Sequence, residues 1–123
     1  MSYSYKWIGN DIVFSFIGEI TFDDLDQANS EIYRDSRFDL MKYAIFDFLR
    51  VTHVSLNEEE MEVISALDQS IARWNRNLRL ALVGTDHNNV EEMILRYLKL
   101  MGNNEWDIEH FDHLESAIDW CLK

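Results

Sequence analysis

The order of strand-like and helix-like segments constrains this chain more than any other feature of its sequence. Two alternating apolar segments, residues 2–8 and 12–17, flank Gly9-Asn10 and predict an opening β-hairpin. Helix-type and strand-type patterns then alternate to the end of the chain, which gives the order β-β-α-β-α-β-α-β-α. Strands separated by helices pair in parallel through right-handed crossovers. The sequence therefore predicts an α/β fold with an open, mixed, five-stranded sheet and an antiparallel first strand.

The predicted elements are bounded by capping residues and by changes of hydrophobic period. Helix starts are marked by side chains that can cap the first turn, at Thr21, Asn57 and Asp112. The helices are expected over about 22–34, 58–76, 89–101 and 113–122, each with an apolar stripe at helical spacing. After the hairpin, strands are expected over about 42–49, 78–83 and 106–111.

Alternation within the strands predicts which face of the sheet the helices cover. If successive strands are also neighbours in space, every crossover helix lies on the same face, and the other face stays open. One set of strand positions is uniformly apolar and should face the helices: Tyr5, Trp7, Phe14, Phe16, Leu80, Leu82, Trp106 and Ile108. The opposite set mixes charged and apolar residues, which is typical of a face that meets water. We expect Ala44, Phe46 and Phe48 to form the apolar centre of that open face.

The core between sheet and helices is expected to be a single layer. Its members should be Phe14, Phe16, Leu25, Ile45, Ile64, Leu67, Leu80, Leu82, Ile94, Leu98 and Ile118. The only cysteine, Cys121, lies on the apolar stripe of the last helix and is interpreted as an inert buried thiol.

Composition and charge restrict the class of protein. The 123 residues include 23 Asp plus Glu against 11 Lys plus Arg, and the net charge of −12 repels nucleic acid and anionic membrane surfaces. Because 47% of the residues are hydrophobic, the chain has enough apolar area to fold, and its length suits one domain over residues 1–123. It has neither an apolar leader nor an apolar run of membrane-spanning length, so we predict a cytoplasmic protein.

The sequence carries no motif for catalysis or for binding a cofactor. It has no glycine-rich phosphate loop and no nucleophile elbow. His110 and His113 straddle a strand-to-helix junction without a metal-ligand pattern, and we interpret them as polar loop and cap residues. The run Glu58-Glu59-Glu60 complements a helix dipole. We predict that the protein is not an enzyme and uses no cofactor or metal.

Two predicted loops follow parallel strands at their carboxyl ends, where α/β sheets bind ligands. Their polar side chains lie near two helix starts and form the candidate binding site, which comprises Thr52, His53, Ser55, Asn57, Asp86, His87 and Asn88. The alternative interpretation is that these residues serve only capping and turn formation.

Several segments resemble those of the SpoIIAA-like, STAS-related family of small bacterial proteins. The similarity rests on the order of elements, on residues 18–24 at the first helix, on the strand 80–84 and on the ending Phe111…Ala117…Trp120…Leu122. It spans essentially the whole chain. The resemblance implies a β-α superhelical sheet with helices mainly on one face, related in fold to the CRAL-TRIO lipid-transfer domains.

The chain departs from that family at the turn after the central strand. Anti-sigma-factor antagonists of the STAS type carry an Asp-Ser-Ser-Gly-like turn there, whose serine is phosphorylated. Aligning Asp47 with the aspartate of that turn places Leu56 or Asn57 at the phosphoacceptor position. Ser55 is close by, but a capping role is available to it. We therefore predict that Ser55 is not a regulatory phosphosite.

Two functional hypotheses follow. The first is a non-enzymatic binding or regulatory module that engages a protein partner through the two loops. The alternative is a small hydrophobic-ligand or lipid-binding protein that uses the open sheet face around Phe46, Val83 and Phe111, by analogy of fold. A weak homodimer through the open face or the first strand is also expected, because an edge strand presents unpaired backbone groups.

Overall fold

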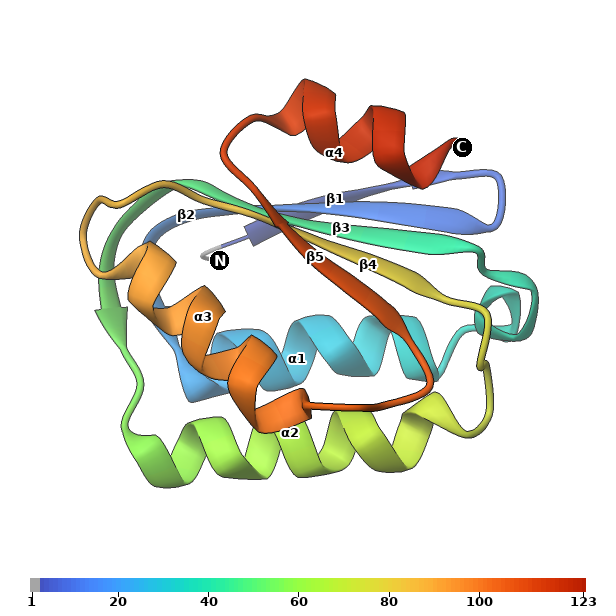
Figure 1. Ribbon diagram of the computed structural model, residues 1–123, viewed down its shortest axis with the longest axis horizontal. Coiled ribbons are helices and arrows are strands. Elements are labelled where there is room, and N and C mark those ends of the chain that lie inside the picture. Colours follow the sequence, from blue (N-terminus) through green and yellow to red (C-terminus); the bar gives the residue numbers. More distant parts are fainter. Residues whose placement is uncertain (1–2) are drawn as a thin grey trace.

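The computed structural model describes residues 3–123, which form five strands, four α-helices and one 3₁₀-helix (Figure 1). In chain order these are β1 (Tyr3–Ile8), β2 (Asp11–Thr21), α1 (Phe22–Tyr33), η1 (Ser36–Leu40), β3 (Tyr43–Ser55), α2 (Glu58–Ala72), β4 (Arg79–Val83), α3 (Val90–Met101), β5 (Asp107–Phe111) and α4 (Leu114–Cys121). This confirms the predicted order of strands and α-helices, whereas η1 was not predicted. Ser2, which the predicted first strand included, lies outside the described residues.

The sheet is open and mixed, as predicted. Its strand order is β1-β2-β3-β4-β5, with β1 antiparallel to β2 and all other neighbours parallel. The crossover helices α1, α2 and α3 lie on one face, and α4 alone lies on the other (Figure 1). Among residues 3–123, no helix combines the length and the apolar character needed to cross a bilayer.

The second face is less open than predicted because α4 packs on β3, β4 and β5. Beneath α4 lies a small second core that contains Tyr43, Ile45, Ala81, Val83, Ala117 and Cys121. Helix α4 follows the last strand and connects no pair of strands. The right-handed crossover rule therefore does not place it on the face that carries α1, α2 and α3. Burial raises the pKa of the Cys121 thiol to about 11, in keeping with the predicted inert thiol.

The predicted orientation of β3 is wrong. Phe46 pairs with Phe14 and with Leu82, so the set of Ala44, Phe46 and Phe48 faces the crossover helices and is buried. Ile45 faces α4 instead of the main core. Both sets of β3 positions are apolar, so alternation could not distinguish its two faces.

The main core contains most of the other residues predicted for it, but two of them are exposed. Leu67 is 48% exposed, because α2 buries the neighbouring face that carries Ile64 and Asp68. Ile118 is 37% exposed on α4, which buries Ala117 and Cys121. Leu98 is half-buried against the core.

Strands β2 and β3 are longer than predicted, and this affects the candidate site. Their pairing passes through two register shifts, after Ser15 and after Gly18, at each of which β3 carries an extra residue. Gly18, which was expected to end the strand, instead lies within β2 at φ +78°. Beyond the shifts β3 continues to Ser55, so Thr52 and His53 are strand residues and not turn residues.

Two of the three predicted helix caps are confirmed. Thr21 and Asn57 each form a reciprocal capping box with the N3 residue, Asp24 and Glu60 respectively. The third is wrong: α4 is preceded by His113 at its N-cap, whereas Asp112 lies one residue earlier.

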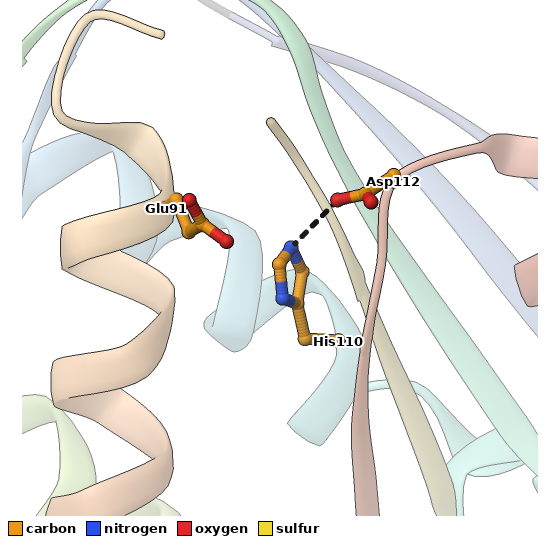
Figure 2. A group of neighbouring side chains, drawn as sticks. All are labelled: Glu91, His110 and Asp112. Carbon is orange, nitrogen blue, oxygen red and sulfur yellow. Dashed lines mark ion pairs between the residues drawn. The ribbon is translucent and has the colours of Figure 1, made fainter. Parts of the chain in front are cut away.

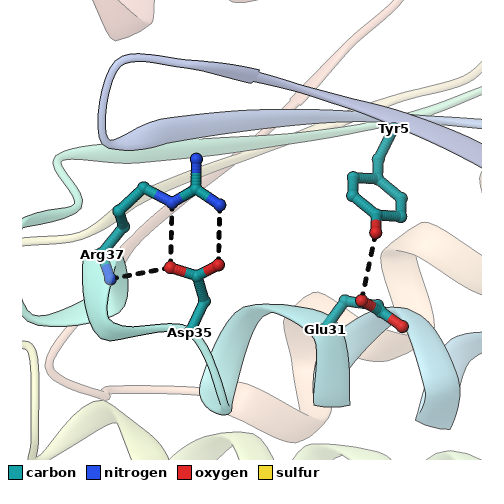
Figure 3. Close-up of polar contacts among 4 residues, drawn as sticks. All are labelled: Tyr5, Glu31, Asp35 and Arg37. Carbon is teal, nitrogen blue, oxygen red and sulfur yellow. Dashed lines mark hydrogen bonds and ion pairs between the residues drawn. The ribbon is translucent and has the colours of Figure 1, made fainter.

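The edge strand β1 is attached to α1 and η1 by polar contacts (Figure 3). The hydroxyl of Tyr5 donates a 3.2 Å hydrogen bond to Glu31 on α1. Arg37 donates to both oxygens of Asp35, at 2.9 and 2.7 Å, and its guanidinium carbon lies 3.7 Å from the centre of the Trp7 ring. Hydrogen bonds from Arg37 lower the pKa of Asp35 to about 2. These contacts hold the apolar side of β1 against the helical layer.

Candidate functional site

The carboxyl ends of β4 and β5 lie side by side, and β3 continues past them from Asp47, which pairs with Val83, to Ser55. We call this end of the sheet the carboxyl edge (residues 51–58, 84–91 and 110–112). Helices α2 and α3 both begin there. This is the edge at which open α/β sheets bind ligands.

The seven residues predicted as a binding site all lie along this edge. Thr52, His53 and Ser55 are in β3, and Asn57 is the N-cap of α2. Asp86, His87 and Asn88 form the loop between β4 and α3. Six of the seven are exposed, and Ser55 is half-buried.

One hydrogen bond joins the β4–α3 loop to β3 next to Thr52. Nδ2 of Asn88 donates to the carbonyl oxygen of Val51 at 3.2 Å, so the β4–α3 loop lies against the end of β3. Asn88 and Asn89 both adopt left-handed conformations, with φ of 53° and 64°, a region that asparagine tolerates better than most residues. The loop is therefore shaped by its asparagines.

Ser55 does not have the predicted capping role. Its hydroxyl donates a 2.6 Å hydrogen bond to a carboxylate oxygen of Glu19 on β2, while Asn57 caps α2. A phosphate at Ser55 would stand against that carboxylate, which is an unfavourable pairing of like charges. That Ser55 is not a phosphosite stays a prediction.

A groove next to the carboxyl edge was not predicted. It lies between the first turn of α2 and the outer side of α3 and has a volume of about 440 Å³. Its lining is mixed: Val54, Leu56, Met61, Met93 and Leu95 are apolar, and Asn57, Glu58, Asn89, Glu92, Arg96 and Lys99 are polar or charged. Leu95 is 51% exposed. An ion pair between Arg96 and Glu58 joins the two helices at the groove.

A cavity of about 50 Å³ lies between the sheet and the crossover helices. Its lining is mostly apolar, and its polar groups gather around the buried carboxylate of Asp68 on α2. Tyr33 and Tyr97 each donate a 2.6 Å hydrogen bond to this carboxylate, and Asn29 donates another at 3.3 Å.

Burial raises the pKa of Asp68 to about 6, although the two tyrosine hydrogen bonds act to lower it. Burial also raises the pKa of both tyrosines well above the ordinary value. Sequence reasoning missed this group. The available signal was its spacing, since Asp68 follows Met61 by seven residues and Ile64 by four, which places it on the buried stripe of α2.

The open-face ligand surface around Phe46, Val83 and Phe111 is not present. Phe46 is 7% exposed on the opposite face, and Val83 is fully buried in the small core beneath α4. Phe111 packs on Trp120 of α4, with ring centres 5.5 Å apart. These three residues therefore do not form a common exposed surface.

A second group at the carboxyl edge contains titratable side chains (Figure 2). His110 pairs across the sheet with Leu82, so its ring lies on the face of the crossover helices, beneath α3. Glu91 of α3 and Asp112 after β5 lie beside it. His110 is thus a half-buried residue of β5, within the strand predicted over 106–111, and not a simple loop or cap residue, whereas His113 is exposed at the start of α4.

No protein-family model matches this sequence, and no curated protein matches it either. A solved structure is similar to it: an uncharacterized protein of the DUF3478 family from Shewanella loihica PV-4, described as having a SpoIIAA-like fold. The match has a TM-score of 0.58 at 17% sequence identity and covers 97% of this chain and 91% of that chain. Identity this low is informative about the fold alone. Together with the strand order and the helical layer, the match shows that this chain has a SpoIIAA-like fold.

Proposed function

We propose that this protein is a non-enzymatic binding or regulatory module that engages a protein partner through the β3–α2 and β4–α3 loops. The observation that carries the proposal is the groove between α2 and α3, which begins at Asn57 and Asn89, where these loops enter their helices.

The character of the groove supports a protein partner. Apolar side chains such as Leu95 and Met93 are flanked by charged ones such as Glu92 and Lys99. An apolar centre with a polar rim is the usual anatomy of a protein interface. Exposed Thr52 near the end of β3 and exposed His87 in the β4–α3 loop extend the surface.

Site-specific photo-crosslinking tests this proposal. A photoreactive amino acid at Leu95 should give a discrete crosslinked partner in cells that express the protein naturally. The matched control is the same substitution at Leu40, which is 65% exposed at the end of η1. The proposal also requires that Leu95→Asp weakens capture of the partner while leaving the thermal unfolding midpoint close to that of the wild type. Identical adducts from positions 95 and 40 would contradict it.

A second candidate function is the binding of a small apolar molecule in the cavity beside Asp68. The cavity of about 50 Å³ is well below the roughly 150 Å³ that accommodates benzene in an engineered core. A lipid chain therefore requires separation of the crossover helices from the sheet. Native mass spectrometry of the protein from its own host tests this candidate, and a mass equal to that of the bare chain would exclude a retained ligand.

A further inference from the structure

Side chains from three separate segments converge beneath the first turn of α3 (Figure 2). Glu91 comes from that turn, His110 from β5, and Asp112 from the residues directly after β5. One potential ligand atom from each of the three lies within 4.8 Å of the others. Nε2 of His110 is 3.6 Å from Oδ1 of Asp112.

The backbone holds the imidazole in place. Nε2 of His110 lies 2.7 Å from the carbonyl oxygen of Gly84. Because a carbonyl only accepts, Nε2 carries the proton in this arrangement. The amide of Gly84 donates to the carbonyl oxygen of Phe111 at 3.0 Å, which fixes the end of β4 against β5. A carbonyl oxygen that can also serve as a metal ligand thus lies beside the histidine nitrogen.

We propose that Glu91, His110 and Asp112 bind a divalent transition-metal ion of the Zn²⁺ class. One imidazole nitrogen with two carboxylate oxygens is a donor set suited to such ions, in sites where three protein ligands leave a position open. Mg²⁺ and Ca²⁺ prefer oxygen ligands, so His110 favours the transition metal over them. The ion binds Nε2 in place of its hydrogen bond to Gly84, and the imidazole binds as the neutral tautomer with its proton on Nδ1.

The geometry requires only small movements. Ligand bonds of about 2.0–2.2 Å place the donor atoms of a tetrahedral site roughly 3.4 Å apart. The His110 side chain is 16% exposed, and its Nε2 must leave the 2.7 Å contact with Gly84 to bind the ion, whereas the side chain of Asp112 is 66% exposed and can rotate toward the ion. The amino terminus of α3 disfavours a cation, and the charges of Glu91 and Asp112 offset this effect.

The site goes beyond the proposed function. It tethers α3 to β5 at the base of the β4–α3 loop, whereas the groove lies on the outer side of α3. Loss of metal binding and loss of partner crosslinking are therefore separate results.

Titration of the full-length, metal-free chain with Zn²⁺ by isothermal calorimetry tests the proposal, with Co²⁺ as the spectroscopic probe. We expect one Zn²⁺ per chain. His110→Gln should weaken binding by roughly 100-fold or more, since loss of an outer-shell partner alone costs about 10–100-fold. The matched control is His113→Gln, which removes an exposed histidine only three residues away and should leave the affinity unchanged.

A second variant separates binding from folding. His110→Gln also changes the contact with Gly84, whereas Asp112→Asn alters an exposed side chain and should reduce affinity at an unchanged thermal midpoint. The visible absorption of bound Co²⁺ should disappear in the same variants. Absence of Zn²⁺ binding by the wild type overturns the proposal. The proposal is also overturned if Mg²⁺ binds as tightly as Zn²⁺, or if the affinity for Zn²⁺ depends on His113 instead of His110.

Discussion

The hydroxyl of Tyr97 on α3 donates a 2.6 Å hydrogen bond to Oδ2 of Asp68 on α2, in the interior of the protein. Tyr33 and Asn29 of α1 donate to the other carboxylate oxygen. One buried carboxylate therefore connects all three crossover helices. A buried acceptor of this kind is costly to leave without its donors, so each donor should contribute measurably to stability.

Tyr97→Phe tests this connection. Removal of the hydroxyl deprives a buried carboxylate oxygen of its donor, and we expect the free energy of unfolding to fall by about 1–3 kcal/mol. Tyr5→Phe is the matched control, because the Tyr5 hydroxyl donates to Glu31 at the surface and its loss should change stability by less than about 0.5 kcal/mol. Urea denaturation at neutral pH measures both. Equal effects of the two substitutions would show that the buried hydrogen bond contributes no more to the free energy of unfolding than the surface bond.

Asp68 should make the free energy of unfolding depend on pH. Its pKa is about 6 in the folded chain against an ordinary value of 3.8. Between these values the folded chain binds more protons than the unfolded chain, so the contribution of Asp68 to stability falls as pH rises through this window and is absent above it. The pKa difference corresponds to about 2–3 kcal/mol.

Asp68→Asn isolates this effect, because its side chain is neutral at every pH. The unfolding free energy of the variant minus that of the wild type should rise by about 2–3 kcal/mol between about pH 4 and 7. Denaturant titrations of both proteins at several pH values measure the difference. A difference that stays constant with pH would mean that Asp68 titrates normally.

Leu80→Ala tests the main core. Leu80 is 5% exposed on the helix-covered face of β4, and a large-to-small change there should cost roughly 2–5 kcal/mol. The matched control is Leu67→Ala, at a position that is 48% exposed, with an expected cost below about 1 kcal/mol. Chemical denaturation of both variants decides whether the described orientation of β4 and α2 is correct. A loss under about half a kcal/mol for Leu80→Ala would contradict the burial of this side chain in the main core.

Gly84→Ala tests the packing of α3 on the end of β4. A Cβ at this position would lie 2.5 Å from Cγ1 of Val90 and 2.8 Å from Cδ1 of Ile94. We expect a loss of about 1–3 kcal/mol from overpacking. In the double variant with Val90→Ala the penalty of the added methyl group should shrink, because the closest atom has been removed. Additive effects in this double-mutant cycle would contradict the close approach.

A weak homodimer through the sheet face or β1 remains a prediction. Ile17 on β2 is 46% exposed and lies on the face opposite the crossover helices, since its neighbour Phe16 is fully buried among them. The net negative charges of two chains repel each other, but salt screens this repulsion beyond about 8–10 Å at physiological ionic strength. Association should therefore increase with salt. Sedimentation of the wild type, of Ile17→Lys and of the control Leu40→Lys tests this. Ile17→Lys should reduce a dimer that forms through the sheet face, whereas Leu40→Lys should not. A chain that stays monomeric at high salt and high concentration rules out the dimer.

The local features of the fold could be predicted from the sequence because they depend on neighbouring residues. The capping boxes at Thr21 and Asn57 need only a side chain and the next turn of backbone. The polar segments 51–57 and 84–89 lie at the ends of parallel strands, so their position on one side of the sheet follows from topology. The groove between α2 and α3 could not be predicted, since it depends on how far apart the two helices pack.

The sequence by itself determined the order of elements and therefore the neighbour order of the strands, because consecutive strands joined by short crossovers pair with each other. Only the tertiary structure decided which face of β3 meets the crossover helices. That strand is apolar on both faces, and its orientation follows from pairing with Phe14 and Leu82. The position of α4, the burial of Asp68 among three helices and the convergence of Glu91, His110 and Asp112 also depend on tertiary packing. They join residues far apart in the chain. The spacing within α2 indicates that Asp68 faces inward, but no local pattern shows which side chains meet it.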